Sequence, residues 1–205
     1  QEIWQAVQYF LSISDWAEYM LSGVAKYEHS QASETLLYDV AAGAWSEALS
    51  KMFNIPASYC PAISSSATQS GTLLPEIAAQ WNIDADAIVV TGGGDTQLAI
   101  KSTCPSVDDI VIVSGTTTPI VKIVDHYIID ERERTWTSRH IEPNRFIFEA
   151  NAGVTGLNYQ RLKEVFYPNE GYDVIEIELA ANPHRHCTAS LGSLIATEGS
   201  PVIRG

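Results

Sequence analysis

Apolar residues recur at helical spacing over the first part of the chain. Ser14-Asp15 predicts the start of a helix that runs to Leu21, with Gly23 as its end. A second amphipathic stretch, Trp45–Phe53, predicts another helix. The apolar positions that support the helical character of the first 22 residues are Ile3, Val7, Phe10, Leu11, Trp16, Tyr19 and Met20.

The pattern changes after residue 55. Residues 56–71 are rich in proline, serine and glycine, which favours a surface loop. Pro75–Trp81 predicts a short helix with proline in its first turn. Ala87–Val90 is a short apolar run that is typical of a buried strand. Thr91–Gly94 interrupts this run, and a new helix is expected over Asp95–Ile100.

The second half of the chain combines strands with helices. Strands are expected at 109–113, 119–124 and 145–149, and helices at 156–166, 176–181 and from Thr188 onward. A β-rich middle with helices on either side predicts an α/β or α+β fold.

Composition narrows the class of protein. The chain has 205 residues, of which 45% are hydrophobic, so one large or two small domains with a real core are expected. A net charge of −13 excludes the clustered basic surface that nucleic acid requires, and it disfavours anionic membranes. Three widely spaced cysteines without a CxxC motif indicate reduced thiols and a cytoplasmic protein. Gln1 and the abrupt end at Gly205 suggest a piece of a longer protein.

The most informative local motif is the glycine turn Thr91–Asp95. A strand runs into three glycines and then a carboxylate at a helix start. Glycines let a backbone approach a phosphate or sugar closely, and a carboxylate just beyond a strand points to the ligand cleft of α/β folds. The alternative is that Asp95 only caps the helix that follows it.

Two further loops could hold phosphate. Ser114–Thr118 lies between two apolar strands and offers N–H and hydroxyl donors, although it could be an ordinary threonine-rich turn. Asn151–Gly156 precedes a helix and could pack against a nucleotide or simply need glycine for its backbone. His184, His186 and Cys187 lie close together but match no zinc spacing.

The order of these motifs is more specific than any one of them. Seven segments follow one another as in the FGGY carbohydrate kinases, a family that includes glycerol kinase, xylulokinase and the autoinducer kinase. The chain therefore resembles this family over about 150 residues. The segments are Ser14–Gly23, Ala32–Asp39, Trp45–Leu49, Gly71–Leu73, Val89–Asp95, Gly115–Thr117 and Gly156–Glu164.

The resemblance implies an actin-like, ribonuclease-H-like α/β fold, of which this chain would hold only a part. Residues 1–107 would be the C-terminal half of the family's first domain, and residues 108–205 the beginning of its second domain. The family's N-terminal phosphate motif and later adenosine motif are absent from the sequence. We therefore expect the chain alone to be inactive.

The resemblance also assigns roles. Asp95 corresponds to the general base that accepts the proton of a sugar or polyol hydroxyl during phosphorylation by ATP. Gly94, Thr96 and Gln97 stand where substrate contacts occur. The loop that holds the ATP phosphates corresponds to Gly115, Thr116 and Thr117, and Gly156 and Gln160 match positions beside the nucleotide. Mg²⁺ would neutralise the polyphosphate and contact Asp95 through water.

Two other functions remain open at this point. A chain with incomplete sites could act as a non-catalytic ligand-binding or assembly module, and an exposed sheet edge would favour a homodimer. A nucleotide-dependent oxidoreductase is the other alternative. It is disfavoured because the GxGxxG pattern lacks its third glycine and no acidic residue closes a βαβ unit about 20 residues later.

Overall fold

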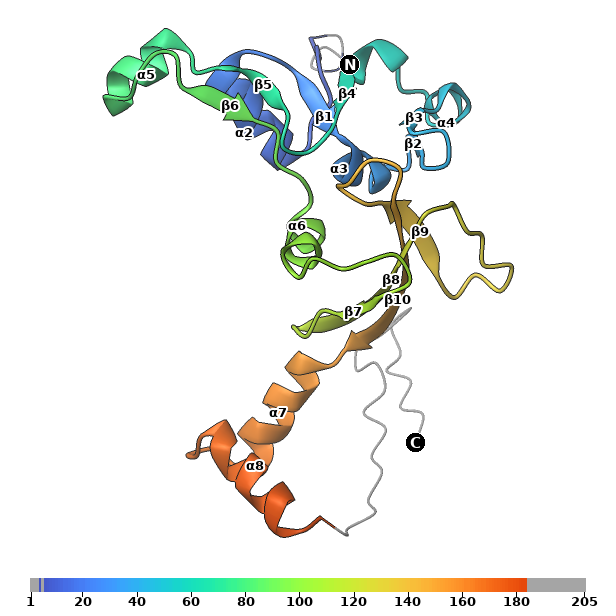
Figure 1. Cartoon of the computed structure of the whole chain (residues 1–205), viewed down its shortest axis with the longest axis vertical. Coiled ribbons are helices and arrows are strands. Elements are labelled where there is room, and N and C mark those ends of the chain that lie inside the picture. The colour runs from blue at the N-terminus through green and yellow to red at the C-terminus, as the bar shows by residue number, and fades with distance from the viewer. Residues whose placement is uncertain (1–3, 5, 184–205) are drawn as a thin grey trace. The chain divides into compact units, whose positions relative to one another are not determined.

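The computed structural model describes residue 4 and residues 6–183 (Figure 1). It is a mixed α/β structure, as the sequence predicts. Its elements in chain order are α2 (Ile13–Ser22), β1 (Lys26–Glu28), α3 (His29–Ser33), β2 (Tyr38–Asp39), β3 (Ala44–Trp45), α4 (Glu47–Met52), η1 (Ala57–Tyr59), β4 (Ala62–Ser64), β5 (Gln69–Thr72), α5 (Pro75–Trp81), β6 (Ile88–Val90), α6 (Asp95–Ser102), β7 (Ile110–Ile112), β8 (Thr117–Val124), β9 (Trp136–Arg139), β10 (Phe146–Val154), α7 (Gly156–Phe166) and α8 (Tyr172–Ala181).

The chain divides into two compact units, and each unit consists of two segments that are separate in the sequence. The first unit comprises residues 1–111 and 122–149, and the second comprises residues 112–121 and 150–205. Strands β8 and β10 contribute residues to both units.

Helix α2 confirms the predicted end but not the predicted start. Its N-cap is Ser12, which has an extended backbone and whose side-chain hydroxyl accepts the Asp15 N–H, so the helix begins at Ile13, one residue before Ser14. The helix ends at Gly23, whose N–H donates to the Tyr19 carbonyl at 2.7 Å. This placement buries Asp15 on the side of the helix that contacts β1.

The serine-rich stretch 56–71 is more ordered than its composition suggests, so the prediction of a loop is wrong there. It contains η1, β4 and most of β5, and β4 pairs in parallel with β1. Buried serine hydroxyls explain how so polar a segment forms strands. Ser64 bonds Thr68 and Thr91, and Ser70 bonds Thr91 at 2.7 Å, so these inward-facing hydroxyls are satisfied by one another.

Two small hydrophobic clusters stabilise the first unit. Tyr27, Ala32 and Tyr38 form one cluster, against which Trp45 packs from β3. The predicted helix 45–53 therefore begins later, at Glu47, after the N-cap Ser46. The second cluster, Leu73, Ala78 and Val89, joins α5 to the antiparallel pair β5–β6.

Helix α5 matches its prediction residue for residue, and β6 and α6 lie where the apolar run and the glycine turn place them. The expectation that β6 is fully buried is wrong on two of its three residues. Val89 is buried, but Ile88 is 59% and Val90 is 44% exposed, because β6 is covered on one face only.

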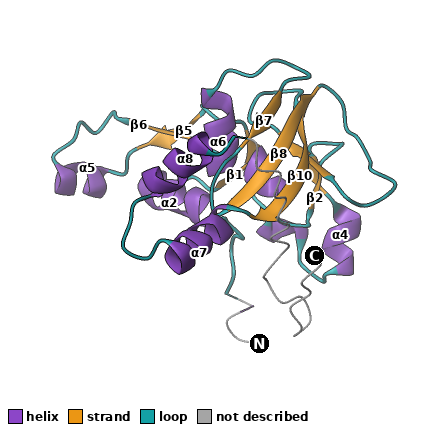
Figure 2. Ribbon diagram, turned by 90° about the horizontal axis from the view of Figure 1, so that it is seen from below, coloured by secondary structure: helices purple, strands orange, loops and turns teal. Residues whose placement is uncertain are grey.

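The four-stranded sheet has the order β7-β8-β10-β9, so β7 and β9 are its edges. Figure 2 shows β7, β8 and β10 side by side in this order. Strands form at the three predicted places, as β7, β8 and β10, and β9 was not predicted. β10 is longer than predicted and runs to Val154, so the expectation of a loop over Asn151–Gly156 is wrong for residues 151–154. The buried apolar residues of this sheet include Val121 and Ile123 on β8 and Ile147 on β10.

Helices α7 and α8 follow the sheet. The bounds of α7 agree with the prediction, and α8 starts four residues earlier than residue 176. The Tyr159 and Tyr172 rings join the two helices with centroids 5.4 Å apart. The helix expected from Thr188 and the cluster of His184, His186 and Cys187 lie outside the described residues. No helix in the described part of the chain has the length and apolar character needed to cross a membrane.

Candidate active site at the glycine turn

The glycine turn presents Asp95 at the first position of α6, with its side chain exposed. The N-cap residue is Gly94, which has no side chain to cap the helix, so Asp95 is not the capping residue. The Asp95 Oδ1 accepts only local bonds, from the Thr96 N–H at 2.6 Å and the Thr96 hydroxyl at 3.3 Å. Asp95 is therefore not the N-cap residue, but its carboxylate accepts an N–H of the first helical turn, which is the local role that the alternative expects, while the side chain stays exposed.

Side chains from elements distant in the sequence form hydrogen bonds with the backbone groups of the turn. The Gly92 N–H donates to Oε1 of Glu18 at 2.7 Å, and the Gly92 carbonyl accepts from the Ser66 hydroxyl. The Gly94 N–H donates to the Ser30 hydroxyl at 2.8 Å. These partners lie on α2, on the β4–β5 connection and on α3, so several parts of the first unit fix the backbone before Asp95.

Gly93 occupies the tightest part of the turn. A Cβ at this position would lie 2.7 Å from the Ser66 hydroxyl oxygen and 3.1 Å from a methyl carbon of Ile141. It would also lie 3.6 Å from Oε2 of Glu28. The middle glycine is therefore required by close packing, and the turn approaches the buried Glu28 side chain directly.

Two buried carboxyl groups lie behind the turn. Glu28 is 0% and Asp15 is 2% exposed. Burial raises the pKa of Asp15 to about 6, although a hydrogen bond from Ser12 opposes the change. Burial also raises the pKa of Glu28, and hydrogen bonds from Ser30 and Gln31 oppose that change. Both groups resist ionisation because their charged forms lose water without gaining a cation as partner.

The predicted substrate residues differ in their exposure. Thr96 is half-buried beside Asp95, whereas Gln97 is 7% exposed and turns into the protein. Its amide oxygen has no hydrogen-bond partner among the described residues. An unsatisfied buried acceptor is costly, but this oxygen is closed to solvent, so a ligand would reach it only if the groups that cover it moved aside.

The predicted phosphate loop lies in the second unit with its predicted neighbours. The Gly115 carbonyl accepts the Gly156 N–H at 3.1 Å, and the Thr116 carbonyl accepts the Thr155 N–H at 3.2 Å. A Cβ on Gly156 would overlap the Gly115 carbonyl group, so only glycine allows this approach. The structure brings together Gly115, Thr116 and Gly156, and it leaves Gly115 and Thr116 exposed to solvent.

The remaining predicted residues of this loop region are less constrained. Thr117 is exposed at the start of β8. Gln160 lies one turn into α7, where its amide donates to Glu164 at 2.8 Å on an exposed helix face. That contact is an ordinary local pair between residues four positions apart and does not by itself indicate a nucleotide.

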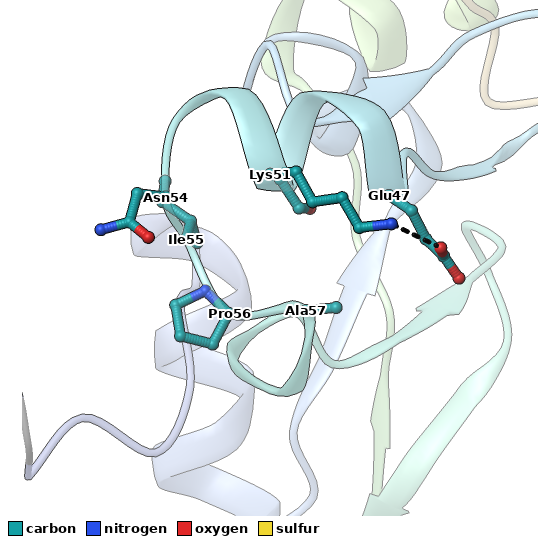
Figure 3. A pocket seen from close by; sticks show the side chains of 7 residues that line it. Glu47, Lys51, Asn54, Ile55, Pro56 and Ala57 are labelled. Carbon is teal, nitrogen blue, oxygen red and sulfur yellow. Dashed lines mark ion pairs between the residues drawn. The ribbon is translucent and has the colours of Figure 1, made fainter.

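Two cavities of the first unit have linings that do not include Asp95. One, of about 400 Å³, is lined by residues of 47–57 and carries an exposed Glu47–Lys51 pair at 3.6 Å (Figure 3). The other, of about 250 Å³, is lined by residues that include His29, Arg139 and His140. The Arg139 guanidinium there already donates to two backbone carbonyls, at 2.7 and 2.8 Å.

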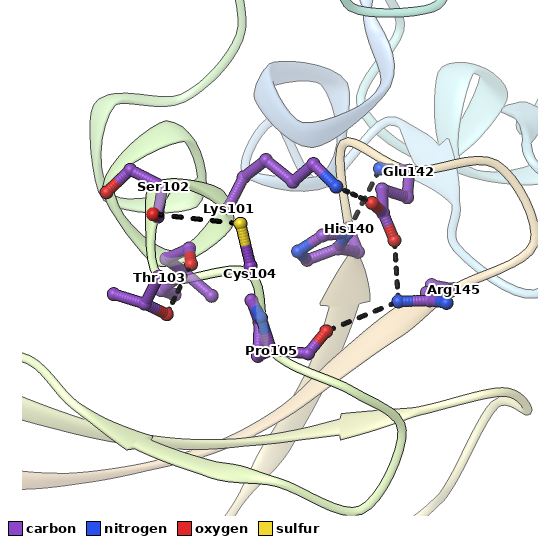
Figure 4. A network of polar contacts seen from close by, with 9 residues as sticks. Lys101, Ser102, Thr103, Cys104, Pro105, His140, Glu142 and Arg145 are labelled. Atoms are coloured by element: carbon purple, nitrogen blue, oxygen red, sulfur yellow. Dashed lines mark hydrogen bonds and ion pairs between the residues drawn. The ribbon is translucent and has the colours of Figure 1, made fainter.

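A polar network ties the far end of α6 to the connection between β9 and β10. Glu142 pairs with Lys101 and with Arg145, the latter at 2.6 Å, and its N–H donates to His140 Nδ1 (Figure 4). Burial lowers the pKa of His140 to about 4, so its imidazole is neutral. The helix that begins with Asp95 is thus anchored at both ends. Among the described residues, no three His, Cys, Asp or Glu side chains gather as a metal site.

The sequence predicts Asp95 as a site residue but gives little indication of the residues that hold its turn in place. Glu18, Ser30 and Ser66 lie between 26 and 74 positions away from their partners in the turn. No local pattern connects them, because each bond depends on tertiary contacts. The sequence offers one signal for two of them. Glu18 lies within the family-like segment Ser14–Gly23, and Ser30 lies just before the segment Ala32–Asp39.

Comparison with known proteins identifies the family. Residues 1–101 match the N-terminal domain of the FGGY family of carbohydrate kinases. The chain belongs to this family. It is 45% identical over 205 residues to the Bacillus subtilis protein named "Putative sugar kinase YoaC", covering 99% of this chain and 42% of that protein. The chain therefore spans less than half the length of that FGGY relative.

Solved structures agree on the fold of this FGGY chain. A xylulose kinase from Brucella ovis superposes with a TM-score of 0.77 at 18% identity, over 87% of this chain and 37% of that one. A glycerol kinase from Plasmodium falciparum, solved with ADP, gives a TM-score of 0.70 at 19% identity, over 81% and 34%. These superpositions confirm the expected actin-like sugar-kinase fold, of which this chain holds only a part.

Proposed function

We propose that this chain supplies the general base and part of the nucleotide site of an ATP-dependent kinase for a sugar or polyol. The observation that carries the proposal is the exposed carboxylate of Asp95, held at a helix start by a turn whose backbone is fixed by three side chains. Asp95 accepts the proton of the substrate hydroxyl. The hydroxyl oxygen bonds to the γ-phosphorus while the bond to the bridging oxygen of the departing ADP breaks.

Substrate contacts are proposed for the residues around the base. The Gln97 amide oxygen, which is buried without a described partner, accepts a substrate hydroxyl once the groups that cover it move aside. Thr96 and the Gly94 backbone lie on either side of Asp95 and complete the contact. A sugar or polyol matches such a site, since it offers several hydroxyl donors at short spacing.

The nucleotide is proposed to bind through backbone groups. Gly115, Thr116 and Thr117 hold the phosphates of ATP, with Gly156 and Gln160 beside the nucleotide. The exposed loop and the close Gly115–Gly156 contact support this assignment, and the solved glycerol kinase contains ADP. Mg²⁺ fits a site with one carboxylate because it is held mostly by phosphate oxygens and water, with Asp95 contacting it through water.

The proposal also covers the setting of the protein. Residues 1–107 and 108–205 are assigned to the first and second kinase domains, and the protein acts in the cytoplasm on a small molecule. The charge of −13 supports the absence of nucleic-acid and membrane partners. Because the chain spans 42% of its relative, activity is tested in a full-length FGGY kinase that contains these residues.

The test replaces the base without changing its shape. Asp95→Asn in the full-length kinase should lower kcat by about 10²- to 10⁴-fold, since the amide cannot accept the proton. ADP affinity, measured by calorimetry, should stay within about twofold because the phosphate loop is untouched. Asp86→Asn, an exposed aspartate before β6, is the matched control and should behave as wild type. Undiminished turnover in Asp95→Asn would remove Asp95 from the mechanism.

A further inference from the structure

A line of hydrogen bonds runs through the first unit from α2 to the glycine turn. Ser12 donates to Oδ2 of Asp15 at 2.7 Å, and Oδ1 of Asp15 accepts the Glu28 N–H at 3.2 Å. Oε2 of Glu28 accepts the Ser30 hydroxyl, and that hydroxyl accepts the Gly94 N–H at 2.8 Å. The line ends one residue before Asp95.

The Ser30 hydroxyl bonds both Glu28 and Gly94, and its donor and acceptor roles in these two bonds are fixed. A hydroxyl has one proton to donate and lone pairs to accept with. The Gly94 N–H can only donate, so the Ser30 proton must go to Glu28. Oε2 of Glu28 also accepts the backbone N–H groups of Ser30 and Gln31, at 2.8 and 3.1 Å. Three donors on one oxygen fix the side chain, and Glu28 in turn fixes the direction in which Ser30 accepts.

This arrangement replaces a helix cap. Gly94 is the N-cap of α6 but offers no side-chain acceptor. The Gly94 N–H is instead satisfied from outside the helix, by a serine that is 2% exposed. The backbone N–H that precedes Asp95 is thereby bonded to a buried side chain of α3. A lateral shift of this peptide would move the Asp95 carboxylate with it.

The burial of Glu28 indicates that this line has a role beyond stability. Glu28 is fully buried, and its Oε1 has no partner among the described residues. Burying a carboxyl group with one unsatisfied oxygen is unfavourable, and burial correspondingly raises its pKa. A nonpolar residue would avoid this cost but could not orient Ser30.

We propose that Glu28 and Ser30 are positioning residues for Asp95, acting through the Gly94 N–H. The inference rests on the proposed function, in which Asp95 is the base. General-base catalysis needs the carboxylate within hydrogen-bond reach of the substrate hydroxyl, and a misplacement of about 1 Å can cost about 100-fold in rate. Ser30 and Glu28 should therefore affect kcat but not the affinity for the nucleotide.

The experiment removes the hydroxyl in the full-length kinase. Ser30→Ala should lower kcat about 10- to 100-fold with the KM for ATP within about twofold, because the base is displaced while the phosphate loop is not. Ser50→Ala is the matched control. Ser50 is also buried, at 4% exposure, but its hydroxyl lies on α4 and has no described partner. It should lose no activity.

Conservative variants separate positioning from folding. Glu28→Gln keeps an oxygen acceptor for Ser30 and should retain kcat within about threefold, whereas Glu28→Ala should match Ser30→Ala. Ser30→Thr keeps the hydroxyl and should recover most of the turnover. Thermal unfolding of each variant is measured alongside. A Ser30→Ala protein that loses stability but keeps its kcat would overturn the inference.

A second measurement needs no activity. In the 205-residue chain, the Gly94 amide should exchange with solvent at least tenfold faster in Ser30→Ala than in Ser50→Ala. Equal protection in both variants would overturn the inference. Failure of the proposed function gives a different result, because Asp95→Asn would then retain turnover whatever happens to Gly94. If Asp95→Asn is inactive and Ser30→Ala turns over like wild type, only the positioning role is lost.

Discussion

Gly93 is the residue of the turn with the least room for a side chain. We expect Gly93→Ala to lower the free energy of unfolding by about 1–3 kcal/mol, because its methyl group would overlap the Ser66 hydroxyl and crowd Ile141. Urea unfolding of the 205-residue chain measures the change. Gly92→Ala is the control, since a Cβ there meets only Glu18, at 3.5 Å. Equal stabilities for the two variants would contradict the tight packing described for Gly93.

At the scale of single residues, the sequence predicts Asp95 as the base that we propose, but it does not predict the residues that hold the turn before it. Asp95 follows three glycines, and both the local motif and its place in the series pointed to it. Ser30 and Glu18 could not be found in this way, because their partners in the turn are 64 and 74 positions away. Residues whose role depends on tertiary contacts carry no local pattern when only one sequence is read.

Among the elements, the contact of α2 with β1 buries an acid that should make stability depend on pH. The folded-state pKa of Asp15 is raised to about 6 by burial, above its ordinary value of 3.8. The folded protein thus binds this proton more tightly than the unfolded chain. The stabilisation is present below pH 4 and is lost as the pH rises through 6.

Asp15→Asn tests this linkage. The difference in free energy of unfolding, variant minus wild type, should become more positive by about 1–3 kcal/mol between pH 4 and pH 7, because only wild type loses stability through this group. Urea unfolding at several pH values measures it, and the difference cancels the titration of groups common to both proteins. A difference that stays flat with pH would show that Asp15 has an ordinary pKa.

Predictions of elements failed where polar side chains satisfy one another inside the protein. Residues 56–71 suggested a loop because serine and glycine usually favour turns, yet β4 and β5 form there with Ser64 and Ser70 buried against Thr91. The predictions held where local signals suffice, as in α5 with proline in its first turn. Composition could not reveal that the hydroxyls of separate strands would meet.

For the molecule as a whole, the order of motifs predicted the fold better than any single element did. The family match over residues 1–101 and the superpositions on sugar kinases confirm it. The division at residue 107 stays a prediction, because the compact units exchange segments near residues 112–121. Since the chain spans 42% of its relative, surfaces that a whole kinase would cover can be exposed here.

Strand β7 is the clearest such surface. It is the end strand of its sheet, and Ile110 and Ile112 on it are 65% and 62% exposed. An exposed apolar edge strand is a template for pairing with another chain. We therefore expect the 205-residue chain alone to self-associate, with a light-scattering mass that rises with protein concentration. Added salt should strengthen the association by screening the charge of −13.

Lysine at both positions should restore a monomer, because two buried charges at a strand interface would be too costly and lysine commonly protects natural edge strands. Ile110→Lys combined with Ile112→Lys is compared with Ile129→Lys, which adds charge at a residue that is 74% exposed but lies outside any strand. The control should still associate. Circular dichroism verifies that each variant stays folded. A wild-type chain that remains monomeric at every concentration and salt would show that the β7 edge does not pair, and would count against an assembly role for this chain.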